Sequence, residues 1–330
     1  MQLPPSLREA IDRELEGIAL ADLARASERL SHRYRAEIRD NRFHVDDEPA
    51  AHAYLTTRLP ATYAAITHCL RAVTEVRPGF VPRTVLDAGA GPGTATWAAA
   101  EQWPSLEEGC LIEGSTAMQQ VGARLVAGLP MRASWQTGSL DATCPDAAVH
   151  DLVLMAYVLD ELAPAARDQL IPRLWQVTGD TLVIVEPGTS AGWRRILRAR
   201  DQLIAAGAHI LAPCPHAKRC PLSPPDWCHF SARVSRSRLH RQAKGGTVPW
   251  EDEKFIYLAA SRQAPAQQPP RVIAPPYVSK SDVRLKLCQP SGIATEHRIA
   301  TRASEAFKKV RKLAWGDALP EETTIEKVAL

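Results

Sequence analysis

The 330-residue sequence contains no apolar run long enough to cross a membrane, which takes about 20 consecutive apolar residues. Its first residues, MQLPPSLREAIDRELEG, carry charges from the eighth position onward and include no apolar stretch of signal-peptide length. Lysine and arginine (40) nearly balance aspartate and glutamate (37), so the net charge of +3 does not by itself indicate a nucleic-acid partner. We therefore expect a cytoplasmic protein without membrane contacts.

Cysteine pairs at the C-x2-C or C-x4-C spacing of zinc fingers and ribbons are also absent. Four of the seven cysteines form a different pattern: Cys214, Cys220, Cys228 and, sixty residues later, Cys288. In a reducing compartment, clustered thiols are more often metal ligands than disulfides. Their long, uneven spacing favours a 4Fe-4S cluster, in which each iron takes one thiolate. A zinc site that includes His216 or His229 is the alternative, and chance clustering of buried thiols is the remaining one.

A glycine-rich turn, Asp87-Ala88-Gly89-Ala90-Gly91-Pro92-Gly93, ends the strand-like segment TVLDAGA and precedes the helical segment TATWAAAEQW. Glycine allows a sharp turn and a close approach of the backbone to a ligand. The spacing differs from the GxGxxG of nicotinamide-binding loops. It resembles the S-adenosylmethionine loop of class I methyltransferases, in which the acidic residue helps to hold the methionine part of the cofactor.

Two further pieces follow in the order that such enzymes use. Glu113 ends the next strand-like segment, where a carboxylate can accept both ribose hydroxyls, and GSLD follows the third strand, where adenine is usually contacted. We predict that S-adenosylmethionine is bound by Asp87, Gly89, Gly91, Gly93, Glu113, Ser139 and Leu140. An ordinary tight turn and a surface carboxylate are the alternatives.

Strand-like and helical segments alternate from residue 83 to about 186, which is typical of a parallel sheet covered on both faces. The residues before it have apolar positions at helical spacing. We predict an α/β fold: a Rossmann-like class I methyltransferase sheet with an N-terminal helical region and a C-terminal cysteine cluster joined to a small β extension. The corresponding domains are 1–80, 81–210 and 211–330.

The segment after the fourth strand contains Asp160 and Glu161, which are candidates for orienting a methyl acceptor. Two solvated acids beside packed leucines are the alternative. The Asn/Asp-Pro-Pro-aromatic signature of enzymes that methylate exocyclic base nitrogens is absent, and no cysteine stands where it could attack a pyrimidine ring. The sequence therefore does not identify the acceptor atom.

A basic segment, FSARVSRSRLHRQAKGG, follows the cysteines and has no acidic residue before Glu251. Its basic residues are Arg233, Arg236, Arg238, Arg241 and Lys244. They could neutralise phosphates, while Trp227, Phe230 and His240 could stack on bases. We predict RNA contact here, and no DNA; a solvated basic helix is the alternative.

From Thr84 through EPGTSAGWRRIL, PCPHAKRCPLSPPDWCHF and PWEDEKFIYLAASR, the sequence resembles the bacterial branch of the methyltransferase-like proteins of the small ribosomal subunit. The mitochondrial members of that family are assembly factors. The resemblance covers most of residues 50–320 and implies binding to small-subunit ribosomal RNA or a pre-ribosome, with a 4Fe-4S cluster on the four cysteines. It leaves two functions open: an S-adenosylmethionine-dependent rRNA methyltransferase, and a non-catalytic RNA-binding assembly factor.

Overall fold

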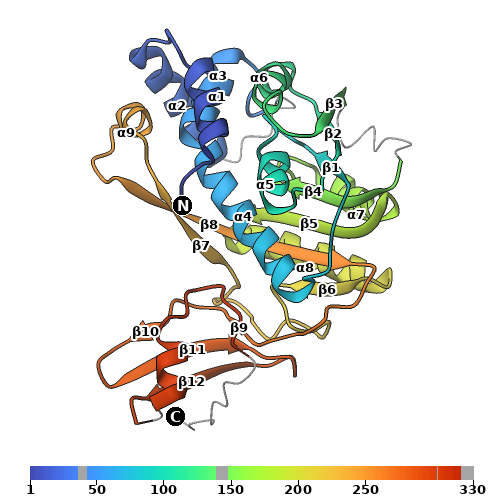
Figure 1. Ribbon diagram of the computed structural model, residues 1–330, viewed down its shortest axis with the longest axis vertical. Helices are drawn as coiled ribbons and strands as arrows, with labels where there is room; N and C mark the ends of the chain where they lie inside the picture. Colours follow the sequence, from blue (N-terminus) through green and yellow to red (C-terminus); the bar gives the residue numbers. More distant parts are fainter. Residues whose placement is uncertain (36–42, 139–147, 303, 321–330) are drawn as a thin grey trace.

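The computed structural model describes residues 1–35, 43–138, 148–302 and 304–320 (Figure 1). Within these residues, four helices precede the first strand: α1 (Pro5–Glu14), α2 (Leu20–Arg35), α3 (Glu48–Thr57) and α4 (Leu59–Val76). Asp47 caps α3, because its carboxylate accepts a hydrogen bond from the backbone N–H of Ala50 (2.7 Å). α4 is buried on most sides and packs against α5, β7 and β8, so the predicted helical region is joined to the core. No helix in the described ranges is both long and apolar enough to span a bilayer.

The central sheet has eight strands in the described part of the chain: β1 (Thr84–Ala88), β2 (Glu108–Glu113), β3 (Arg132–Thr137), β4 (His150–Ala156), β5 (Thr178–Pro187), β6 (His209–Ala212), β7 (Phe230–Ser235) and β8 (Trp250–Ser261). Their order is β3-β2-β1-β4-β5-β8-β6, and β7 pairs with β8. β1 to β5 are parallel, whereas β8 is antiparallel to its neighbours. The predicted α/β sheet is confirmed.

Helices cover this sheet: α5 (Thr94–Gln102), α6 (Thr116–Val126), α7 (Pro164–Gln176) and α8 (Ser190–Ala205). β4 and β5 consist largely of consecutive buried apolar residues, as strands do when helices cover both faces of a parallel sheet. α4 packs against α5, and α7 against α8.

The direction in which the sheet grows reverses at β1: β2 and β3 lie on one side of it, and β4 and β5 on the other. The loops after β1 and β4 therefore diverge, and they leave a crevice outside the carboxyl ends of the strands. Open parallel sheets bind their ligands at this switch point. The glycine turn follows β1, and Asp160 and Glu161 follow β4, so both predicted sites lie at this edge.

β7 and β8 continue beyond the sheet as a long hairpin, and the connection between them forms α9 (Arg238–Ala243). The hydroxyl of Ser237 caps α9 by accepting a hydrogen bond from the backbone N–H of His240 (3.0 Å). α9 packs against α2 and α3 (Figure 1). The predicted basic segment is therefore held on the N-terminal helices.

A second sheet follows, which Figure 1 shows apart from the first: β9 (Arg271–Val272), β10 (Tyr277–Val278), β11 (Asp282–Cys288) and β12 (Ala294–Ala300), with α10 (Ser304–Val310). β11 and β12 form a hairpin, since they are antiparallel and Gly292 takes a positive φ of 85° in the turn between them. One face of this sheet packs with α10 into a small core of its own. The predicted β extension is confirmed.

An aromatic cluster joins α4 to β7 and β8. The His68 ring lies 6.1, 5.3 and 6.3 Å from those of Phe230, Phe255 and Tyr257. Burial lowers the pKa of His68 to about 4. The unfolded chain takes up this proton near pH 6.5, so folded-state stability should fall by about 2 to 3 kcal/mol as the pH drops from 6.5 to 4. Urea unfolding of wild-type and His68→Gln chains across this range tests it; equal pH dependence would contradict the assignment.

Candidate cofactor pocket and cysteine cavity

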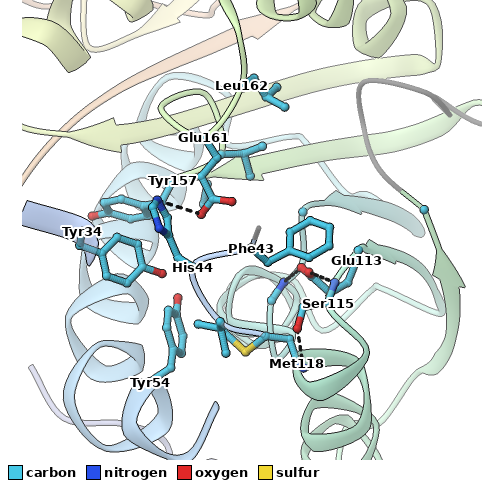
Figure 2. A pocket seen from close by; sticks show the side chains of 17 residues that line it. Tyr34, Phe43, His44, Tyr54, Glu113, Ser115, Met118, Tyr157, Glu161 and Leu162 are labelled. Atoms are coloured by element: carbon cyan, nitrogen blue, oxygen red, sulfur yellow. Dashed lines mark hydrogen bonds and ion pairs between the residues drawn. The ribbon is translucent and has the colours of Figure 1, made fainter. Parts of the chain in front are cut away.

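A cavity lies at the switch point, between the carboxyl ends of β1, β2 and β4 and the N-terminal helices (Figure 2). Its volume is about 740 Å³ with the open mouth included, which is within the range of small-molecule sites. Three tyrosines and His44 form one wall, and Phe43, Glu113, Ser115 and Met118 lie opposite. The cavity is thus shared between the sheet and the N-terminal helices.

The three glycines of the turn have different roles. All take positive φ angles: 75° at Gly89, 55° at Gly91 and 82° at Gly93. Gly89 and Gly91 line the cavity, and a Cβ on Gly91 would meet only the Cε atom of Met118, at 3.9 Å. Gly93 caps α5 instead, and a Cβ there would lie 2.6 Å from the Val126 side chain. Gly93 is therefore required by packing, and Gly89 and Gly91 leave room for a ligand.

Asp87 is buried beneath the turn and does not line the cavity. Its Oδ2 accepts hydrogen bonds from the backbone N–H (3.0 Å) and the hydroxyl (2.8 Å) of Thr96 in α5. Burial raises the pKa of Asp87 to about 6, against the effect of these two donors. The carboxylate fixes α5 to the end of β1 and so holds the turn in shape. In this structure its hydrogen bonds are made to Thr96, and a contact of Asp87 with a cofactor stays a prediction.

Glu113 ends β2 inside the cavity. Its Oε2 accepts a hydrogen bond from the backbone N–H of Gly91 (2.7 Å), and its Oε1 accepts one from that of Ser115 (2.7 Å). Burial raises the pKa of this carboxyl, while the backbone N–H groups of Ser115, Gly91 and Gly114 lower it. A carboxylate has about four acceptor positions, so Glu113 can still accept from a hydroxyl donor in the cavity. This arrangement suits a diol such as a ribose.

The wall opposite comes from residues that the sequence did not single out. Tyr34 comes from α2, Tyr54 from α3, and Tyr157 directly follows β4. Tyr157 has a φ of 61°, which is uncommon for a bulky residue and occurs most often at functional sites. Its hydroxyl donates to Glu253 Oε1 (3.1 Å) on β8. In the sequence, the one signal that could have pointed to Tyr157 was its position directly after the fourth strand.

The two acidic candidates separate in the structure. Glu161 lines the cavity and lies 3.9 Å from His44 Nε2, whereas Asp160 is not among the described lining residues. Burial, together with the negative charges of Asp160 and Glu113, raises the pKa of Glu161 and favours its protonated form. Glu161 can therefore donate as well as accept a hydrogen bond here. Ser139 and Leu140, predicted to contact adenine, lie outside the described residues.

A second cavity brings together all four predicted metal ligands. Cys214, Cys220, Cys228 and Cys288 line it together with apolar side chains from α8 and β8. None of the four forms a disulfide, and the Sγ of Cys288 lies 3.4 Å from His216 Nε2. Burial and the neighbouring sulfurs raise the pKa of Cys228, and that of Cys288 to about 12. These thiols would need a cation to become thiolates, as metal ligands do.

Arg200 holds the cysteine loop in place. Its side chain is buried, and its Nη2 donates to the backbone carbonyls of His216 (2.8 Å) and Lys218 (2.6 Å), between Cys214 and Cys220. A positive charge beside these sulfurs also favours their thiolate forms. Arg200 thus fixes the loop that carries these cysteines, although the loop forms no helix or strand.

The spacing of the sulfurs bears on the kind of metal. A tetrahedral zinc ion with Zn–S distances near 2.3 Å places its sulfurs about 3.8 Å apart. Among the described residues, the group of three or more candidate ligand atoms within 4.8 Å of one another is Glu14, Glu48 and His52, and no trio of cysteines meets this limit. The four thiols line one cavity, and no three of their sulfurs lie within 4.8 Å of one another.

The basic segment is largely paired within the chain. Arg233 forms two hydrogen bonds to Asp252 (both 2.8 Å), and Glu251 accepts from both Arg236 (2.9 Å) and Lys244 (3.4 Å). Phe230 and His240, expected to stack on bases, are fully buried, and Trp227 is half-buried. Arg238 is exposed and Arg241 is half-buried.

Comparison with known proteins identifies the family. A family model described as "Mitochondrial small ribosomal subunit Rsm22" matches residues 48–320, which is most of the chain. The chain belongs to this family. Its central sheet has the α/β arrangement, with β1 to β5 parallel, that the sequence predicted.

Ribosome assembly protein METTL17, mitochondrial, of Homo sapiens is 29% identical over 325 residues, covering 91% of this chain and 70% of the human protein. Two Schizosaccharomyces pombe proteins, Rsm22-cox11 tandem proteins 1 and 2, mitochondrial, are each 21% identical over 347 residues, covering 89% of this chain and 46% of theirs. The chain therefore spans about half the length of these two relatives. The predicted cytoplasmic location is contradicted, because the family and these relatives are described as mitochondrial.

Solved structures with a similar fold include two methyltransferases with bound SAH. Magnesium protoporphyrin IX methyltransferase of Synechocystis has a TM-score of 0.40 and 14% identity, covering 71% of this chain and 94% of its own. The plantazolicin methyltransferase BpumL has the same TM-score and identity, covering 78% of this chain and 99% of its own.

Proposed function

We propose that this Rsm22-family chain binds S-adenosylmethionine and acts on small-subunit ribosomal RNA during ribosome assembly. The observation that carries the cofactor assignment is Glu113, whose carboxylate faces an open cavity while Gly91 and Ser115 hold it in place. The name of the human relative and the family description support the assembly role on the small subunit.

Methyl transfer requires little acid–base catalysis from the protein. A sulfonium methyl group transfers by displacement when donor and acceptor are aligned. Glu113 would bind the ribose hydroxyls, and the turn at Gly89 and Gly91 would let the rest of the cofactor approach the backbone. Glu161 and Tyr157 are placed to orient an acceptor from the other wall. Asp160 does not line the cavity and would act through its negative charge, which raises the pKa of Glu161.

A non-catalytic assembly factor is the second candidate, and Phe43 favours it. This ring packs directly on Gly114, beside Glu113, where a Cβ would lie 2.3 Å from the ring. The ring takes up part of the cavity beside Glu113, which would narrow the room for an acceptor. Under this alternative, the cofactor would stabilise the fold without reacting.

We further propose that Cys214, Cys220, Cys228 and Cys288 hold a 4Fe-4S cluster; zinc is the alternative. The bound group would supply positive charge to these buried sulfurs beyond that of Arg200. Three ligands come from the loop before β7 and the fourth from β11, so the group would fasten the small sheet to the methyltransferase core. Its role in this proposal is structural.

Glu113→Ala tests the cofactor assignment. It removes the acceptor for the ribose hydroxyls and should weaken S-adenosylmethionine binding by about 10- to 150-fold, the usual worth of hydrogen bonds to a charged group. Equilibrium dialysis with labelled cofactor measures it. Glu108→Ala, at the exposed opposite end of β2, is the matched control and should bind as wild-type does. Equal affinity in the two variants would contradict the assignment.

The same variant separates the two candidate functions. In cells that carry Glu113→Ala as their single copy, a methyltransferase would leave a nucleotide of the small-subunit RNA unmethylated. Normal methylation of that RNA despite lost cofactor binding would exclude the enzymatic function.

A further inference from the structure

One face of the small sheet carries a row of three side chains from three neighbouring strands. Tyr277 on β10 is directly opposite Arg284 on β11, and Arg284 is directly opposite Arg298 on β12. Residues paired in this way point to the same face of a sheet. The guanidinium of Arg284 lies over the Tyr277 ring, 5.3 Å from its centroid. All three remain more than half exposed, at 57%, 62% and 53%.

The three side chains of this row add nothing to the core of the small sheet, and their arrangement carries an electrostatic cost. Two arginines directly opposite one another repel, and Asp282 is the carboxylate that both share. Arg298 Nε donates to Asp282 Oδ2, and Arg284 Nε lies 3.8 Å from the same oxygen. One carboxylate between two cations leaves the row positively charged. The fold alone does not explain the positive charge of this row.

The two faces of β11 have different tasks. Val283, Leu285 and Leu287 pack with α10 into the core of the small sheet. The alternating residues face the other way: Lys286 pairs with Asp226 of the cysteine loop, and Cys288 lines the metal cavity. Arg284 lies on this second face, four residues from Cys288 and about 13 Å along the strand. This face of β11 is thus held against the cysteine loop near Cys288 and is exposed near Arg284.

Charge is concentrated in this unit. Residues 277–312 contain nine lysines and arginines and three acidic residues, a net charge of +6, although the whole chain carries only +3. The segment 233–244, by contrast, is opposed by Glu251 and Asp252. The small sheet and α10 therefore carry a net positive charge of their own.

We propose that Tyr277, Arg284 and Arg298 form a binding surface for single-stranded RNA. Tyr277 would stack on an unpaired base, and the two arginines would contact successive phosphates, as in other single-strand binding surfaces. A duplex offers no free base face to Tyr277, so it should bind less well. This inference rests on the proposed function, since it names the surface through which the chain would hold ribosomal RNA.

Fluorescence anisotropy with the anaerobically purified, metal-loaded full chain tests the surface against a short unstructured RNA, a duplex of equal length and polyglutamate. Arg284→Gln with Arg298→Gln should weaken single-strand binding by about tenfold or more and reduce the slope of log affinity on log salt by about 1.4. Tyr277→Ala should weaken it by about 5- to 100-fold and leave that slope unchanged. Arg311→Gln with Lys312→Gln removes the same charge just beyond α10 and should change affinity by less than about threefold.

Each outcome decides between specific alternatives, provided that thermal unfolding shows all variants folded. Equal losses in the two double variants would overturn the surface and leave the proposed RNA function standing. A wild-type chain that binds no RNA would overturn both. Reduced polyglutamate binding with unchanged RNA affinity would assign the row to an acidic protein and overturn the RNA surface. Preference for the duplex in the wild-type chain would overturn the stacking role of Tyr277.

Discussion

A Cys288→Ser chain should lose its metal and unfold at a markedly lower temperature than the wild-type chain. Cys288 supplies the ligand from β11, whereas the other three thiols lie in one loop. A group that binds only the folded chain stabilises it by about 4 kcal/mol when present at a thousandfold its Kd. For a chain of this size that corresponds to roughly 6 °C. Metal and sulfide analysis, visible absorption and thermal unfolding measure the loss.

Cys110→Ser is the matched control for this experiment. Cys110 lies on β2 and is 8% exposed, against 7% for Cys288, so both changes replace a buried thiol by a hydroxyl. The control should keep its metal content. Iron and sulfide retained in full by the Cys288→Ser chain would contradict the ligand assignment. One zinc per wild-type chain, without sulfide, would contradict the 4Fe-4S cluster and keep the four ligands.

The glycine turn was predictable because its geometry is local: a buried strand, positive φ angles and a helix follow one another within about fifteen residues. The role of Asp87 was not. Whether this carboxylate meets a ligand or the following helix depends on Thr96, which reaches back to it from the first turn of α5. Sequence spacing places a group at a strand end but does not say which donor it finds there.

Contacts between distant segments explain the other differences. β8 returns beside β7 in a register that sets Asp252 opposite Arg233, so a segment with no acid of its own is neutralised by its neighbour. The cavity wall at Tyr34 and Tyr54 likewise comes from helices far upstream of the strands that it faces. Neither pairing leaves a periodic signal in the sequence. That the four cysteines lie together could be predicted, because clustered thiols in a reducing compartment are more often metal ligands than disulfides.

The second large effect is expected at the buried ion pair behind the cofactor cavity: Arg195→Met should lower the free energy of unfolding by about 3 to 5 kcal/mol. Glu186, at the end of β5, is completely buried. Its Oε2 accepts from Arg195 Nε (2.6 Å), and its Oε1 accepts from the backbone N–H of Leu159 (3.0 Å). Burial raises the pKa of this carboxyl, and Arg195 opposes the rise. Without Arg195, the buried carboxyl would lose its compensating charge and could avoid an unpaired charge only by taking up a proton, which weakens its hydrogen bond from the backbone N–H of Leu159.

Urea unfolding compares this variant with Arg198→Met, three residues along the same helix. Arg198 pairs with Asp168 at the surface, where solvent screens the interaction, so its removal should leave the free energy of unfolding close to the wild-type value. Replacing Glu186 by leucine in the Arg195→Met chain removes the carboxyl that has lost its partner, and it should restore part of the lost stability. A double variant no more stable than Arg195→Met would show that the loss comes from packing of the arginine side chain, because an unpaired carboxylate would no longer be present.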